Sequence, residues 1–156
     1  MLKDKHFADS IEILRSNIKN LVYMIIAQYN EVISALNSAN IDLAHEVINN
    51  DADINRLSEE IDLDTVSLIA KIHLPFPELR YVVTINKLAY ELERIADYAK
   101  NIAGYVIAGK KMNVEKAREY IASFNDMFTV ILKMLEINLQ AFLQEDKCRA
   151  RTALRQ

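Results

Sequence analysis

Apolar residues recur every three or four positions along four long stretches of the chain, which is the spacing of an amphipathic α-helix. The first stretch is interrupted by the polar pair Gln28 and Tyr29, whereas the third has the most regular apolar repeat. The predicted helices run from Phe7 to Leu36, from Ile41 to Leu74, from Glu78 to Ala108 and from Val114 to Gln144. The repeat of the third consists of Ile85, Leu88, Leu92, Ile95, Ala99, Ile102 and Val106.

The segments between these stretches carry the residues that end and begin helices. Asn40 or Asp42 can cap the second helix. Pro75 and Pro77 separate the second helix from the third, and Gly109 suits a left-handed residue after the third. Because connections this short make neighbouring helices antiparallel, the chain is predicted to be all-α, an up-down bundle of long helices.

Composition narrows the class of protein. The chain has only two Gly and two Pro in 156 residues, so it lacks the turn-forming residues that a many-stranded β fold needs. The single cysteine, Cys148, excludes an internal disulfide framework, and a net charge of −3 argues against a nucleic-acid binder. The longest apolar run, residues 21–27, is far shorter than the ~20 residues of a membrane span, so a cytoplasmic protein is predicted.

Acidic residues are concentrated at the start of the second helix. Residues 41–64 hold eight acids and one base, a charge of −7, so the rest of the chain carries +4. Such a stripe is compatible with a solvated helix face, with a cation site or with a basic partner.

The third helix carries a ladder of polar residues spaced four apart: Glu93, Asp97 and Asn101. At 100° per residue these positions lie about 100° to 180° around the helix from Leu92, away from the apolar stripe. The two carboxylates repel each other unless a positive group lies near them. Lys100, Arg94 and a metal ion are the candidates, since carboxylate and amide oxygens suit hard cations.

Catalytic motifs are missing from the chain. The three histidines, His6, His45 and His73, are scattered, and no Glu-x-x-His, His-Glu-x-x-His, P-loop or Gly-x-Ser-x-Gly sequence is present. We therefore predict that the protein is not an enzyme.

Two segments resemble the PhoU family. Leu79-Arg80, followed by Leu-Glu-Arg-Ile-Ala-Asp-Tyr-Ala-Lys-Asn-Ile-Ala at residues 92–103, is similar to the family signature, and residues 47–62 look like the family's acidic second helix. The resemblance implies a complete three-helix repeat over residues 1–109. Residues 110–156 then supply the first helix and part of the second helix of an incomplete second repeat. The sequence departs from the family pattern at Ala96, where glycine is usual, and at Tyr90 and Glu91.

The resemblance implies a cytoplasmic regulator of phosphate uptake and phosphate-starvation signalling. The implied partners are the ATPase of a phosphate ABC transporter, a sensor histidine kinase or a phosphate permease, with membrane association through those partners. Some members of the family bind iron or zinc, which implies Glu93, Asp97 and Asn101 as metal ligands here. The alternatives are a regulatory module of a sodium/phosphate or other permease, a carboxylate-bridged metal enzyme, and a helical scaffold whose ladder is only solvated charge.

The fourth helix is apolar around much of its circumference, and such a helix must be buried. We therefore expect it to pack on the bundle, on a membrane partner or on a second copy of the chain, and we predict a homo-oligomer. The residues are Met127, Phe128, Val130, Ile131, Leu132, Met134 and Leu135.

Overall fold

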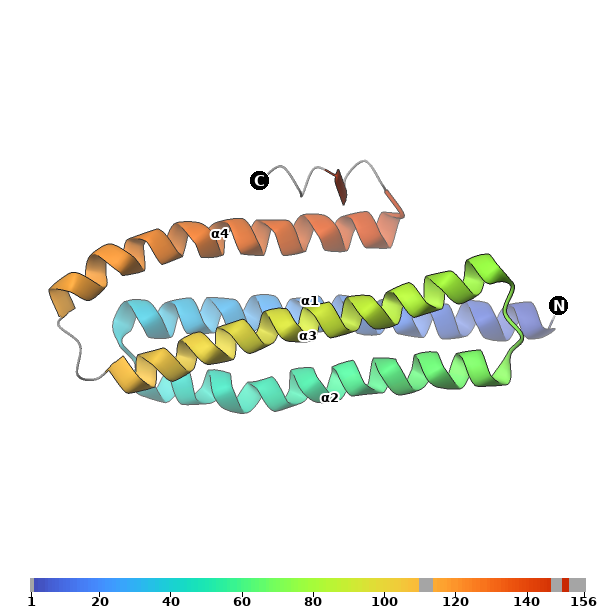
Figure 1. The fold of residues 1–156 in the computed structure, drawn as a ribbon, viewed down its shortest axis with the longest axis horizontal. Coiled ribbons are helices and arrows are strands. Elements are labelled where there is room, and N and C mark those ends of the chain that lie inside the picture. Colours follow the sequence, from blue (N-terminus) through green and yellow to red (C-terminus); the bar gives the residue numbers. More distant parts are fainter. Residues whose placement is uncertain (1, 110–113, 147–149, 152–156) are drawn as a thin grey trace.

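Four long helices run up and down in turn, as the computed structural model in Figure 1 shows. The structure describes the backbone of residues 2–109, 114–146 and 150–151, and the side chains of residues 5–109, 124–146 and 150–151. The described residues contain no strand, which confirms the all-α prediction. The elements are α1 (Leu2–Ser38), α2 (Ile41–Lys71), α3 (Phe76–Ala108) and α4 (Val114–Gln144).

The helix ends follow local backbone chemistry. The side chain of Asn40 accepts a hydrogen bond from the Leu43 amide at 3.1 Å, so Asn40 rather than Asp42 is the N-cap of α2. Ile72 is extended, so α2 ends three residues before the predicted end. Pro75 is the N-cap of α3, which begins two residues earlier than predicted. These differences arise because proline fixes its own backbone and restricts the preceding residue.

One predicted backbone conformation is wrong. Gly109 has a φ of −72° and is therefore not left-handed. The positive φ values at described non-glycine residues are those of Ala39 and Glu145, which follow α1 and α4. After Glu145 the amide of Ala150 donates to the carbonyl of Asp146, the start of another helical turn. Cys148 and the last five residues lie outside the described part of the chain.

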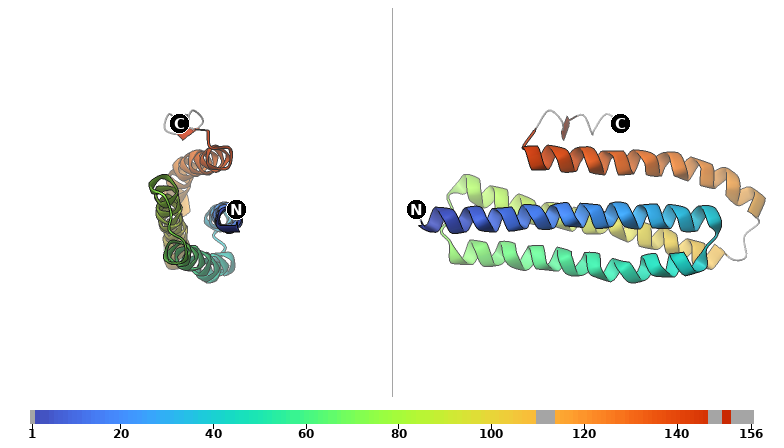
Figure 2. Two further views of the ribbon diagram at one scale, coloured as in Figure 1. Left: turned by 90° about the vertical axis from the view of Figure 1, so that its right-hand side faces the viewer. Right: turned by 180° about the vertical axis from the view of Figure 1, so that it is seen from behind.

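Helices α1, α2 and α3 pack against one another, and α4 lies along α1 on the opposite side from α2 (Figures 1 and 2). The core is formed by the apolar stripes that the periodicity predicts, including Leu21, Ile54 and Leu92. Small residues on α3, such as Ala96 and Ala99, are fully buried and allow the helices to approach closely. The family's usual glycine is thus replaced here by a residue that the bundle accommodates.

Helix α4 is attached to the bundle at three places. Phe128 is fully buried and its ring packs edge-on against Tyr29, with 5.9 Å between ring centres. The side-chain amides of Asn37 and Asn125 bond each other at 3.1 and 3.3 Å. Near the end of α4, Arg15 of α1 pairs with Glu145 at 2.9 Å. Helix α4 thus packs on the bundle with one side, while Met127 on another side is 44% exposed in the single chain. Burial of that side by a second copy or a membrane partner stays a prediction.

Candidate functional site

The predicted ladder on α3 lies at the edge that faces α2, not on a fully outward face. Glu93 and Asp97 are half-buried, and Asn101 is exposed. The helical angles place these residues outside the core, but they do not show that Glu93 lies in a groove between α2 and α3. The Asp97 side chain keeps 44% of its surface exposed.

A cluster of polar side chains joins three helices beside this ladder. It consists of Gln28 on α1, Asp51 and Asn55 on α2, and Asp97 and Lys100 on α3, and we call it the polar cluster. At its centre, Asp51 is only 2% exposed. Its carboxylate accepts hydrogen bonds from Gln28 Nε2 at 3.2 Å, Asn55 Nδ2 at 3.3 Å and Lys100 Nζ at 2.8 Å.

Lys100 is the cation of the polar cluster. Its Nζ lies 2.8 Å from Asp51 Oδ2 and 3.6 Å from Asp97 Oδ1. The other candidate, Arg94, pairs with Glu91 at 3.2 Å instead. The sequence therefore identified two possible neutralising residues, and the structure assigns the role to one of them.

The electrostatics of the cluster follow from this geometry. The hydrogen bond from Lys100 to Asp51 is the main cause that raises the pKa of Lys100. Burial raises the pKa of Glu93, and repulsion by Asp97 and Asp51 raises it further. Glu93 thus lies in a negative environment that Lys100 and Arg94 neutralise only in part.

The predicted metal site has two carboxylates, Glu93 and Asp97, and one amide, Asn101. Within the described ranges, no three His, Cys, Asp or Glu side chains are placed to hold one ion. The position between Asp51 and Asp97, where an ion could bridge two helices, is within reach of the Lys100 ammonium. Metal binding by Glu93, Asp97 and Asn101, with iron or zinc, stays a prediction.

A groove of about 500 Å³ runs between α2 and α3 next to the polar cluster. Leu63 and Tyr90 line the groove and are 67% and 60% exposed, and Glu93 lines it as well. Asn86 donates a 2.7 Å hydrogen bond to Asp62 across the groove. Tyr90, one of the departures from the family pattern, therefore stands beside the ladder with its ring open to solvent.

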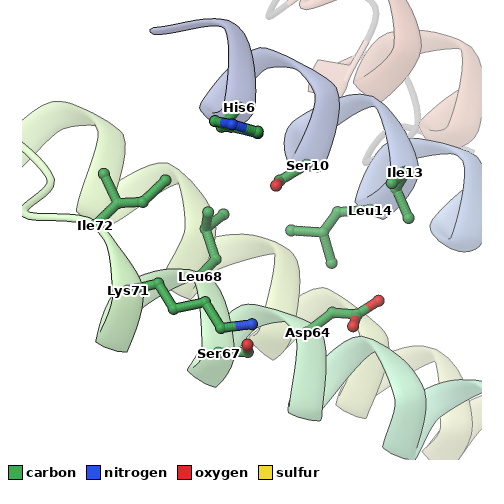
Figure 3. A pocket seen from close by; sticks show the side chains of 9 residues that line it. All are labelled: His6, Ser10, Ile13, Leu14, Asp64, Ser67, Leu68, Lys71 and Ile72. Atoms are coloured by element: carbon green, nitrogen blue, oxygen red, sulfur yellow. The ribbon is translucent and has the colours of Figure 1, made fainter. Parts of the chain in front are cut away.

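A second hollow, of about 510 Å³, lies between the start of α1 and the end of α2. Figure 3 shows His6 and Ser10 on α1 opposite Asp64 and Lys71 on α2. His6, Ser10 and Asp64 are the residue types of a catalytic triad, but no hydrogen bond among the described residues links His6 to Ser10 or Asp64. The linked nucleophile and base that a triad requires are thus not formed at this hollow.

None of the helices, searched over the described residues, is both long enough and apolar enough to cross a bilayer.

Comparisons with known proteins identify the fold family. Residues 6–106 match the model of the PhoU domain. The chain is 31% identical over 147 residues to the phosphate-specific transport system accessory protein PhoU homolog 1 of Thermotoga maritima, covering 94% of this chain and 62% of that protein. It is 29% identical over 140 residues to the phosphate-specific transport system accessory protein PhoU of Escherichia coli, covering 90% of this chain and 57% of that protein.

The chain thus spans about three fifths of the length of these two relatives. No solved structure matches it significantly. The domain match begins within α1 and ends within α3, so it covers the three mutually packed helices and the whole polar cluster. On the strength of that match, the chain belongs to the PhoU family.

Proposed function

We propose that this chain is a non-enzymatic, cytoplasmic regulator of phosphate uptake and phosphate-starvation signalling. It acts as an adapter that binds a phosphate transporter, through its ATPase, and a sensor histidine kinase. The PhoU domain match over residues 6–106 carries the proposal, because relatives with this domain are named as accessory proteins of the phosphate-specific transport system.

The groove between α2 and α3 is the surface we assign to a partner. Glu59, Asp62 and Glu93 line it, and none of the described lysines or arginines forms an ion pair with them. The exposed side chains of Leu63 and Tyr90 add apolar area to this negative surface. The combination fits a basic segment of a partner that also inserts an apolar side chain.

Affinity capture from membranes tests the proposal. The tagged protein is incubated with membranes of phosphate-rich and phosphate-starved cells, and bound proteins are identified by mass spectrometry. Recovery of a phosphate transporter ATPase together with a histidine kinase supports the adapter. Recovery of a permease alone favours regulation of that permease, and recovery of none of these contradicts the proposal.

Two tyrosines of α3 form a matched pair of variants for this experiment. Tyr90 lies in the groove and is 60% exposed, whereas Tyr105 lies near the C-terminal end of α3 and is 75% exposed. We expect Tyr90→Ala to lower capture of the partner about tenfold and Tyr105→Ala to leave it unchanged, as for an aromatic anchor at the centre of an interface. Equal effects of the two variants would exclude the groove as the docking surface.

A further inference from the structure

The polar cluster contains a buried negative charge that needs a cation. Asp51 is 2% exposed, and a carboxylate taken out of water is costly unless it is paired. Three donors reach it, but two of them, Gln28 and Asn55, are neutral amides. Lys100 therefore supplies the only positive charge in direct contact with Asp51 among the described residues.

The Lys100 ammonium occupies the position that a bridging metal ion would need. Metal ions lie about 2.0 to 2.2 Å from carboxylate oxygens, and Lys100 Nζ is already 2.8 Å from Asp51 and 3.6 Å from Asp97. An ion bound to both carboxylates would collide with the ammonium and be repelled by its charge. Metal and Lys100 thus exclude each other from this position.

The two carboxylates that contact Lys100 would nevertheless suit a hard cation. Gln28 Oε1 and Asn55 Oδ1 are buried, and no hydrogen-bond partner reaches either of them in the part of the chain that the structure describes. Gln28 and Asn55 bond Asp51 through their amide nitrogens, and the carboxylates of Asp51 and Asp97 provide oxygen ligands from α2 and α3. Oxygen ligands of this kind are typical of Mn²⁺ and Mg²⁺ sites.

We infer that Lys100 is a built-in cation that takes the place of a metal ion in the polar cluster. The chain as it stands folds and keeps α2 and α3 together without a metal. Removing the charge of Lys100, while leaving the oxygens in place, converts the cluster into a site for a divalent cation. This inference concerns the assembly of the bundle and does not depend on the proposed regulatory function.

The test compares the unchanged protein with Lys100→Gln, Lys100→Arg and the double variant Asp51→Asn/Lys100→Gln. Binding of Mn²⁺ is measured by electron paramagnetic resonance, and the melting temperature is followed by circular dichroism with Mn²⁺ or with EDTA. We expect neither the unchanged protein nor Lys100→Arg to respond to either addition. Lys100→Gln should melt at a lower temperature, bind Mn²⁺ about 100-fold more tightly than the unchanged protein and regain stability with Mn²⁺.

The double variant separates the role of charge from that of packing. It removes the buried carboxylate charge together with its counter-ion, so it should fold without Mn²⁺ and should not bind it, even if Lys100→Gln alone fails to fold. Mn²⁺ binding by the unchanged protein as tight as that of Lys100→Gln would overturn the inference. A double variant that does not fold, or a Lys100→Gln variant that neither binds Mn²⁺ nor is stabilised by it, would also overturn it.

Discussion

Tyr29 connects α1 to two other helices, and replacing it with phenylalanine isolates the role of its hydroxyl group. The hydroxyl donates a hydrogen bond to the carbonyl of Ile95 on α3 at 3.0 Å, and the ring packs against Phe128 on α4. Tyr29 is 2% exposed. Phenylalanine keeps the ring and its packing but removes the hydrogen bond and the ionisable proton.

The substitution has two effects of opposite sign on the free energy of unfolding. Near neutral pH, Tyr29→Phe loses one hydrogen bond, which lowers the free energy of unfolding by about 1 kcal/mol. In alkaline solution the unchanged protein loses its advantage over Tyr29→Phe. The reason is that burial, with a smaller contribution from Tyr98, raises the pKa of Tyr29 from 10.0 to about 12. Tyr29 ionises first in the unfolded chain, where its pKa is lower. The free energy of unfolding therefore falls as the pH rises above the pKa of the unfolded chain, and it stops falling once the pH has passed the pKa of the folded protein.

The size of the alkaline effect follows from the shift. A difference of about two pKa units corresponds to on the order of 2.7 kcal/mol, of which about 1.4 kcal/mol is lost by about pH 11. Tyr29→Phe loses none of this. The variant is therefore less stable than the unchanged protein at about pH 7 and becomes the more stable of the two between about pH 10 and 11.

Urea unfolding followed by far-ultraviolet circular dichroism at several pH values measures this crossing. The lysines and the other tyrosines titrate in both proteins, so the difference between them reports Tyr29 alone. Tyr105→Phe is the control, because Tyr105 is 75% exposed and its loss should produce no crossing. A constant difference between the unchanged protein and Tyr29→Phe from neutral to alkaline pH would refute the burial argument.

Three further predictions concern packing, capping and assembly. Phe128→Ala should lower the free energy of unfolding by about 3 to 5 kcal/mol in urea titrations, and Phe124→Ala, at a site 43% exposed, should cost clearly less; equal losses would contradict the packing of α4 on α1. Asn40→Ala should cost about 1 kcal/mol in thermal unfolding and Asn40→Asp should restore most of it, whereas an unaffected Asn40→Ala would argue against the cap. The uncovered side of α4 predicts self-association in sedimentation equilibrium, which Met127→Glu, at a site 44% exposed, should weaken; a strictly monomeric profile at high concentration would count against it.

The helices and their order could be predicted because each apolar stripe repeats over many turns. The predicted stripe of α3 coincides with the buried residues at Ile85, Leu92 and Ala99. Its other four residues are only partly buried, and the remaining buried positions of α3 are Val82, Ala89, Ala96 and Ala103. The N-cap at Asn40 was one of two candidates. The helix ends near Pro75 differ from the predicted ones, since the chain can leave the helix at any of several residues before a proline. Packing of α4 could not be predicted from its periodicity, because an apolar circumference does not show which side meets α1.

The polar cluster was missed although the sequence contains a signal for it. Asp51 follows Val47 by four positions and precedes Ile54 by three, so it occupies a core position of α2. Gln28 stands in the same way between Ile25 and Val32 on α1. Two polar residues in core positions of neighbouring helices indicate a buried polar contact. The cation that completes it is on a third helix, and only the structure places Lys100 there.

The most direct test of the central proposal is phosphate uptake in cells that lack this gene. Uptake of radioactive phosphate and the level of alkaline phosphatase are measured in phosphate-rich medium, with and without the gene restored on a plasmid. The account predicts that both are derepressed in the deletion strain and return to normal when the gene is restored. Unchanged uptake and unchanged phosphatase in the deletion strain would contradict the proposed regulatory function.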